Sequence, residues 1–196
     1  MSVVSNINLF KPDFMIDCSK LKQASDVYGI MKKNGIKKMY CYTFFYRKDM
    51  LTFDILKIGE SCPSPSPGTN AAIAERVGRQ IAWLEGWNDQ PKSDNGIDFS
   101  LNIKREIQKG NLPTNVVNRN NICIGVWNLD IRPALVFVEK DRSVTTWAEG
   151  TLAQQYKNNN GDRLPLLNYK DPTKNTAFCK SFVSIAHFDD IFTQNC

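Results

Sequence analysis

The chain has little of what zinc sites and redox sites are usually built from. Among its 196 residues there is a single histidine, His187, and no two of the six cysteines are spaced as Cys-x-x-Cys. Structural zinc sites depend on such pairs and on histidines, so the sequence argues against one. Cys41 and Cys123 lie in apolar, strand-like runs. This placement favours reduced thiols in an intracellular protein over a disulfide framework.

Long apolar runs and an excess of one charge are also lacking. No stretch approaches the ~20 apolar residues of a membrane-spanning helix. The first residues have neither the basic start nor the apolar run of a signal peptide. Basic residues number 25 and acidic residues 20, which gives a net charge of +5. This mild excess suits a nucleic-acid partner but decides little alone. We expect a cytoplasmic protein without membrane contact.

Apolar residues, in contrast, are plentiful enough for one compact domain. They make up 42% of the chain, so a real core can form without a disulfide or a metal to hold it together. Internal repeats are absent. The single domain divides into an N-terminal extension (1–36), a hairpin with a following helix (37–87), a polar insertion (88–121), a third strand with a later helix (122–168) and a C-terminal tail (169–196).

Hydrophobic periodicity predicts a mixed α/β fold with a small, largely antiparallel central sheet of three or more strands, flanked by helices. The first two strands should form a hairpin that turns near Asp49. Strands are expected at 39–46, 51–58 and 122–129, with 134–138 as a fourth strand or a continuation of the third. Helices are expected at 19–33, about 70–85, 104–109 and 143–156.

Several residues that suit phosphodiester chemistry follow one another in a definite order. Lys57-Ile58-Gly59 ends the hairpin, Arg76 follows in the next helix, and Glu149 and Asn168 come later. In this order they resemble the GIY-YIG nucleases. In that family two strands carry signature tripeptides, and an arginine, a helical glutamate and a closing asparagine follow. The resemblance covers roughly residues 38–87 and 122–168, and it implies a GIY-YIG-like fold and an endodeoxyribonuclease.

Carried over residue by residue, Lys57-Ile58-Gly59 stands at the second tripeptide, with Lys57 in place of the family tyrosine. Some restriction-type members share this departure. Tyr40-Cys41-Tyr42 is the candidate for the first tripeptide. The hairpin is expected to bring Tyr42 opposite Lys57, which favours Tyr42 as the family tyrosine. Tyr40 shares its strand face with Tyr42 and Tyr46, so Tyr40 stays an alternative. Tyr28-Gly29-Ile30 has similar letters, but it falls on a predicted helix and is rejected.

The later positions of the motif also have candidates. Arg76 matches the family arginine, and Glu149 matches the metal-binding glutamate. Asn168 matches the closing asparagine. Arg79-Gln80 falls where the family often has Arg-His, so Gln80 puts a role based on histidine in doubt.

The chemistry by itself favours these residue types. Phosphodiester hydrolysis needs a nucleophilic water, a base and stabilisation of the charge on the phosphate. Glu149 can hold one Mg²⁺, or Mn²⁺ in its place, and Arg76 can clamp the phosphate with two parallel hydrogen bonds. Tyr42 can orient or deprotonate the water. A phenol is a poor base at neutral pH, so a cation should assist it, and Lys57 is the obvious one.

Double-stranded DNA is the expected partner. Phosphate contacts are expected from basic side chains beside the first strand, in the arginine helix and in the insertion: Lys38, Arg47, Lys48, Arg79, Lys104 and Arg105. One active site per chain implies a homodimer or larger assembly when both strands are cut. The small size and the lack of a separate DNA-reading module favour an enzyme of restriction or phage type.

Two alternatives remain open. The first is a catalytically inactive nucleic-acid-binding module with the same fold, which Lys57 and Gln80 support as departures from the family. The second is a cysteine hydrolase that uses Cys179 and His187, although no recognisable motif surrounds either residue. Each single residue also has an ordinary explanation. Glu149 and Arg76 would lie on solvated helix faces, and the tyrosines would pack within a sheet.

Overall fold

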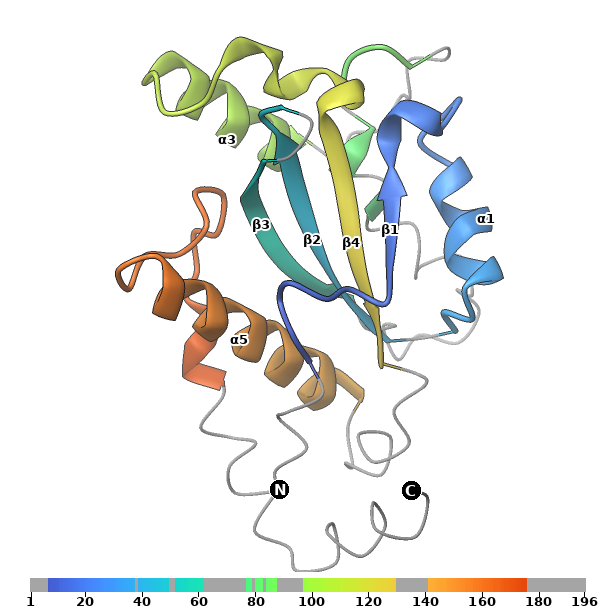
Figure 1. Cartoon of the computed structure of the whole chain (residues 1–196), viewed down its shortest axis with the longest axis vertical. Helices are drawn as coiled ribbons and strands as arrows, with labels where there is room; N and C mark the ends of the chain where they lie inside the picture. Colours follow the sequence, from blue (N-terminus) through green and yellow to red (C-terminus); the bar gives the residue numbers. More distant parts are fainter. Residues whose placement is uncertain are drawn as a thin grey trace, which may run out of the picture.

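A computed structural model describes most of the chain, namely residues 7–37, 39–49, 52–61, 77–78, 80–82, 84–87, 97–129 and 141–175. Within these ranges the protein has a mixed α/β fold, in which a four-stranded antiparallel sheet is accompanied by three α-helices (Figure 1). No helix in these ranges combines the length and the apolar character needed to span a membrane.

The sheet is made of β1 (Phe14–Asp17), β2 (Tyr40–Arg47), β3 (Phe53–Ser61) and β4 (Ile122–Asn128), in the spatial order β1-β4-β2-β3. Each neighbouring pair is antiparallel. The predicted hairpin and the predicted third strand are therefore confirmed as β2, β3 and β4. The sequence patterns did not predict β1. The predicted fourth strand at 134–138 lies outside the described residues.

The part of the chain interpreted as an N-terminal extension contributes to the sheet and to its core. β1 forms one edge of the sheet, where Phe14 pairs with Val126. Helix α1 (Asp26–Lys33) follows and buries Val27 and Met31. As predicted, Tyr28-Gly29-Ile30 lies on this helix and cannot be a strand motif.

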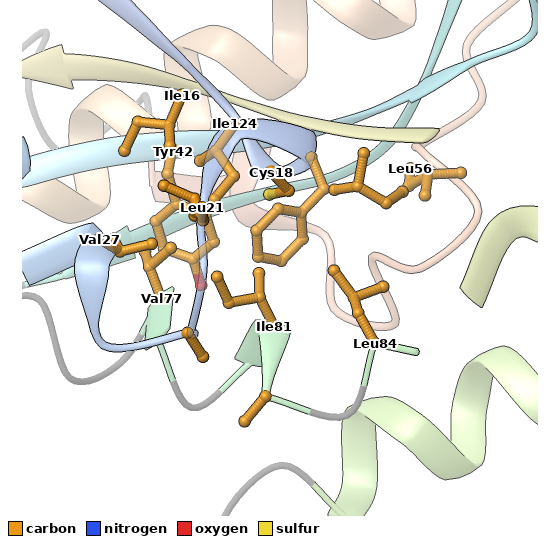
Figure 2. Close-up of a cluster of buried hydrophobic side chains, with 14 of the residues drawn as sticks. Ile16, Cys18, Leu21, Val27, Tyr42, Leu56, Val77, Ile81, Leu84 and Ile124 are labelled. Carbon is orange, nitrogen blue, oxygen red and sulfur yellow. The ribbon is translucent and has the colours of Figure 1, made fainter. Parts of the chain in front are cut away.

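Each side of the sheet has a hydrophobic core of its own. On the side that we call the tyrosine face, Tyr42 packs with residues from α1 and from the helical residues 77–78 and 80–81, and Figure 2 shows this cluster. On the opposite side, the α5 face, helix α5 (Asp141–Asn159) covers β2, β3 and β4. Its apolar side chains in this core are Val144, Trp147, Ala148, Leu152 and Ala153. The helix predicted at 143–156 is confirmed and is longer at both ends.

Helix α3 (Ile97–Gln108) contains all but the last residue of the short helix predicted at 104–109 and is completed by a buried carboxylate. Glu106 accepts hydrogen bonds from Asn111 (2.6 Å) and from the Lys109 ammonium (2.9 Å). These two contacts, Asn111 first, hold the pKa of Glu106 below its usual range. The main-chain carbonyl of Glu106 also accepts from the N–H groups of Asn111 and Leu112, so the last turn of the helix is tied to the loop that follows.

The pairing of the hairpin differs from the prediction. Tyr42 lies opposite Gly59, and Lys57 lies opposite Phe44, so the expectation that Tyr42 faces Lys57 directly was wrong. One cause is a β-bulge, because the pairing passes from Phe44 with Lys57 to Phe45 with Ile55 and leaves Leu56 as an extra residue. The register next to the turn, where Arg47 pairs with Phe53, is the other cause, because even without the bulge it would place Lys57 opposite Thr43. The extra residue shifts the rest of β3 along β2.

Candidate active site

Tyr42 lies across the backbone of Gly59, its partner on β3. A Cβ atom placed on Gly59 would lie 2.5 Å from Cζ and 2.5 Å from the hydroxyl oxygen of Tyr42. No side chain fits in that space unless the phenol moves. The last position of Lys57-Ile58-Gly59 therefore requires a glycine, because the ring of Tyr42 occupies the space of a side chain.

The Tyr42 hydroxyl donates a hydrogen bond of 2.8 Å to Oε1 of Gln80. Gln80 belongs to the helical residues after the hairpin, whose neighbours Val77 and Ile81 are buried beside Tyr42 (Figure 2). This contact ties the strand with the first candidate tripeptide to the helical segment in which the arginine is predicted. Sequence reasoning had treated Gln80 only as a missing histidine. The sequence did contain a signal for a role of Gln80. Gln80 follows Arg76 by four residues, and residues at this spacing in a helix share one face.

Tyr42 is the middle member of a row of aromatic rings along β2. Its ring centroid lies 6.0 Å from that of Tyr40 and 5.4 Å from that of Phe44. Tyr40 lies opposite Ser61, and Tyr46 donates to Oδ1 of Asn115 at 2.8 Å. Of these tyrosines only Tyr42 lies over the glycine of the second tripeptide. Tyr40 and Tyr42 are both fully buried.

Lys57 shares the tyrosine face with Tyr42. It lies directly opposite Phe44, so it is a diagonal neighbour of Tyr42, and such neighbours are typically about 7–8 Å apart. The side chain is partly exposed. A lysine stem can span this separation, so the bulge leaves the cation and the phenol on the same face.

Asn168 closes the outer edge of β3. Its Oδ1 accepts from the N–H of Ile58 and its Nδ2 donates to the carbonyl of Ile58, each at 2.8 Å. The N–H of Leu167 donates to the carbonyl of Leu56 at 2.9 Å. Among the strands that the structure describes, β3 is the last of the sheet, so these bonds satisfy backbone groups that none of the other described strands reaches. Two segments 110 residues apart meet here.

Helix α5 runs antiparallel to β3 along the α5 face. Near the start of the helix, the carbonyl of Thr145 accepts from the thiol of Cys41 at 3.6 Å, and Cys41 pairs with Glu60 near the end of β3. Near the end of the helix, burial and, to a smaller extent, the carboxylate of Asp54 raise the pKa of Tyr156. Asp54 belongs to the start of β3. Glu149 therefore lies beside the middle of β3.

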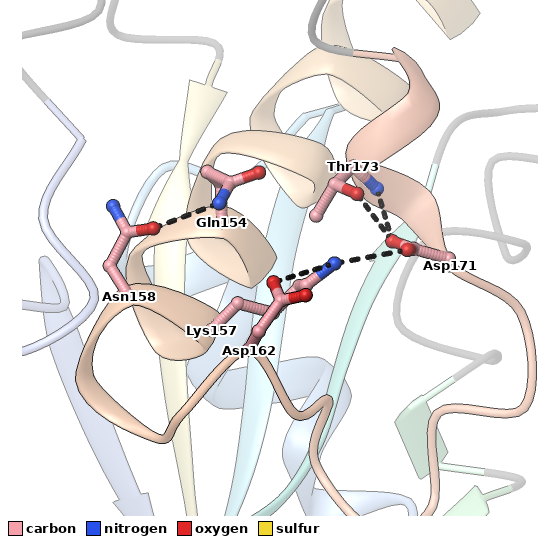
Figure 3. Close-up of polar contacts among 6 residues, drawn as sticks. All are labelled: Gln154, Lys157, Asn158, Asp162, Asp171 and Thr173. Atoms are coloured by element: carbon pink, nitrogen blue, oxygen red, sulfur yellow. Dashed lines mark hydrogen bonds and ion pairs between the residues drawn. The ribbon is translucent and has the colours of Figure 1, made fainter.

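Lys157, near the end of α5, contacts Asp162 at 3.2 Å and Asp171 at 3.3 Å (Figure 3). These aspartates flank the segment that Asn168 fastens to β3, and we call this segment the edge segment. Glu149 lies eight residues before Lys157 on the same helix, and it is half-buried.

The other basic residues are spread over two elements. Arg47 contacts Asp17 at 3.3 Å and stacks over the ring of Phe53 at 5.7 Å, so its charge is matched within the protein. Lys48 lies 2.8 Å from Asp54, and both side chains are about half exposed. Lys104 and Arg105 are exposed on α3.

Tyr169, which sequence reasoning did not single out, directly follows Asn168 and is about half exposed. Partial burial and, to a smaller extent, the Glu106 carboxylate raise the pKa of Tyr169, whereas the charge of Arg105 acts in the opposite direction.

Several predicted residues lie outside the described part of the chain. They are Lys38, Arg76, Arg79, Cys179 and His187. Within the described part, the structure contains no group of three or more histidine, cysteine, aspartate or glutamate residues that could hold a metal ion. Cys18, Cys41 and Cys123 are buried free thiols.

Comparisons of the chain with protein-family models, with curated proteins and with solved structures found no match. The resemblance to GIY-YIG nucleases therefore rests on the residues of this chain and on their arrangement.

Proposed function

We propose that the protein is a metal-dependent DNA endonuclease with a GIY-YIG-like fold and active site. The observation that carries this proposal is the double hydrogen bond between Asn168 and Ile58. It joins the middle of Lys57-Ile58-Gly59 to the segment that follows the glutamate helix. In the sequence only the order of the residues linked these two regions.

The arrangement on the tyrosine face supports the roles given to the hairpin residues. Tyr42 lies over Gly59 and Lys57 lies diagonal to it, which favours Tyr42 over Tyr40 as the tyrosine of the site. In this proposal Tyr42 and Lys57 orient or activate the attacking water. Arg76 clamps the phosphate from the helical segment that Gln80 links to Tyr42.

The available donors fit a single hard cation. A half-buried carboxylate such as that of Glu149 is an oxygen ligand of the kind that Mg²⁺ prefers, and Mg²⁺ commonly keeps water and phosphate oxygens in its remaining positions. When bound, Mg²⁺ or Mn²⁺ would neutralise charge that develops on the phosphate.

The exposed cations on α3 suit the DNA backbone. Lys104 and Arg105 are neighbours on this helix, and both are open to solvent. Such contacts give affinity that weakens with salt and carries no sequence choice. Arg47 is the weaker candidate because Asp17 already matches its charge.

Plasmid cleavage tests the proposal. Wild-type protein with Mg²⁺ should nick or linearise a supercoiled plasmid, and Glu149→Gln should abolish the cutting. Gln154→Ala on the same helix is the matched control, because its side-chain amide bonds only to Asn158 among the described residues. This control variant should cut normally, and circular dichroism should show that both variants fold. Cutting that survives Glu149→Gln would mean that another carboxylate holds the metal.

A second candidate is the inactive nucleic-acid-binding module, and one observation favours it. Tyr40 and Tyr42 are fully buried, whereas a side chain that activates water must reach the substrate. In that case DNA would stay intact with Mg²⁺ and with Mn²⁺. Binding would still weaken when Lys104 and Arg105 are both changed to alanine, which a gel-shift titration measures.

A further inference from the structure

We infer that Gln80 is a positioning residue that holds Tyr42 as a neutral phenol, so that Tyr42 orients a water and does not deprotonate it. The inference rests on the proposed function for the role of Tyr42. The geometric part, that the amide fixes the phenol proton, is independent of that function.

A phenol has one O–H, and in Tyr42 this group donates to Oε1 of Gln80 at 2.8 Å. Any other group that meets the Tyr42 oxygen must therefore donate to it. A water that donates to the Tyr42 oxygen has its own oxygen lone pairs turned elsewhere, which is what an oriented nucleophile requires.

The acceptor of this hydrogen bond is the carboxamide oxygen of Gln80. A carboxamide oxygen is neutral and does not take up a proton near neutral pH, unlike an imidazole or a carboxylate. A proton taken from water by Tyr42 could not be passed on to Gln80. The pair therefore suits hydrogen bonding and not proton transfer.

Close packing surrounds the Tyr42 ring. The Tyr42 ring is bounded by the backbone of Gly59 on β3 and by the ring of Phe44, and it is fully buried. Ile81, next to Gln80, is also buried, and its carbonyl accepts from the indole of Trp87 at 3.1 Å. Packing thus fixes the ring, and the remaining freedom is the torsion of the hydroxyl group. The amide of Gln80 removes that freedom.

A spectroscopic experiment tests the geometric part without any need for activity. The tyrosine Fermi doublet in ultraviolet resonance Raman spectra distinguishes a phenol that donates a hydrogen bond from one that accepts. The wild-type spectrum minus that of Tyr42→Phe isolates Tyr42 and should show the donor pattern. Gln80→Glu should keep this pattern, and Gln80→Leu should lose it. An acceptor pattern in the wild-type protein would overturn the inference whether or not the protein cuts DNA.

A kinetic experiment tests the positioning role. Gln80→Leu should slow cutting roughly 100-fold through kcat, with KM for DNA unchanged. The double variant with Tyr42→Phe should be no slower than Tyr42→Phe alone, because both changes remove one interaction. Gln80→Glu keeps a hydrogen-bond acceptor at this position, so it should cut much faster than Gln80→Leu. Fully additive losses, or a loss explained by a lower melting temperature, would overturn the positioning role.

A pH profile completes the test. The wild-type rate should show no ionisation from position 80, whereas Gln80→His should introduce an inflection near the ordinary imidazole pKa of about 6.5. Absence of that inflection in an active Gln80→His variant would also overturn the role. If wild-type protein cuts no DNA at all, the proposed function fails, and the Raman result alone decides whether Gln80 fixes the Tyr42 proton.

Discussion

At the scale of single residues, the candidate site depends on Gly59, a position that leaves no room for a side chain. Gly59 provides the space in which the Tyr42 phenol lies, and that position brings the hydroxyl within hydrogen-bonding distance of Gln80. A glycine is needed here because it leaves room for the phenol, and not because the backbone has an unusual conformation. Its replacement should therefore disturb the ring and the hydrogen bond together.

Gly59→Ala is expected to destabilise the fold by about 1–3 kcal/mol, because a methyl group must displace a packed ring. Urea unfolding measures the change. Gly29→Ala is the control, since a Cβ at Gly29 meets nothing within 4 Å and lies within α1. That substitution should stabilise by roughly 0.5–1 kcal/mol through helix propensity. Equal stability of Gly59→Ala and wild type would contradict the position of the ring.

At the scale of elements, the sequence predicted the strands better than it predicted their connections. Alternation marked β2, β3 and β4, because their apolar residues repeat on each face. β1 has only four residues, too few to show a period of two against its neighbours.

The bulge at Leu56 left no trace in the pattern, so the register was missed. The Asn168 contact with Ile58 spans distant parts of the chain, which periodicity cannot reveal. Only the resemblance singled out Asn168.

The edge of β3 should depend on both halves of the Asn168 amide. Asn168→Asp loses the donor and places a carboxylate against the carbonyl of Ile58, so a loss of about 1–3 kcal/mol is expected. Hydrogen exchange at the Ile58 amide should become faster in the same variant. Asn160→Ala is the control, because its side chain bonds within its own helical turn, to Tyr156. Unchanged exchange at Ile58 in Asn168→Asp would show that the edge is held by other contacts.

The end of α3 should respond to acid through Glu106. Hydrogen bonds from Asn111 and Lys109 hold its folded pKa below the ordinary value of 4.5. The carboxylate therefore contributes its full stability above pH 4.5 and loses it as the pH falls through the folded pKa. The stability gap between wild type and Glu106→Gln should be largest near neutral pH and should shrink in acid. Denaturant titrations between neutral and acidic pH measure the gap. A constant gap would mean that the charge of Glu106 is unimportant.

At the scale of the whole molecule, the proposal gives each chain one carboxylate site and hence one cut at a time. Helices lie on both faces of the sheet (Figure 1). The candidate residues also lie on both faces, with Tyr42 and Lys57 on the tyrosine face and Glu149 on α5 of the opposite face, and Asn168 meets the outer edge of β3. The opposite edge, formed by β1, is distant from it in strand order. A single copy can therefore present its site to only one DNA strand.

Nicked plasmid should accordingly form at a rate proportional to the protein concentration, and linear plasmid should form with a higher-order dependence. The reason is that a second copy must act on the opposite strand. Time courses over a range of concentrations measure both products, and analytical ultracentrifugation gives the assembly state with and without DNA. Linear product from single encounters of a monomeric protein would contradict a one-site chain.

The strand order also has a consequence for how the chain is made. β1 is synthesised first, yet its partner in the sheet is β4, which also pairs with β2. The hairpin of β2 and β3 can form as soon as it leaves the ribosome, but β1 cannot pair with its neighbour in the sheet until Ile122–Asn128 has been made. During this interval the nascent chain exposes unpaired strand edges. A chaperone that shields these edges should therefore improve the yield most when it acts before β4 emerges.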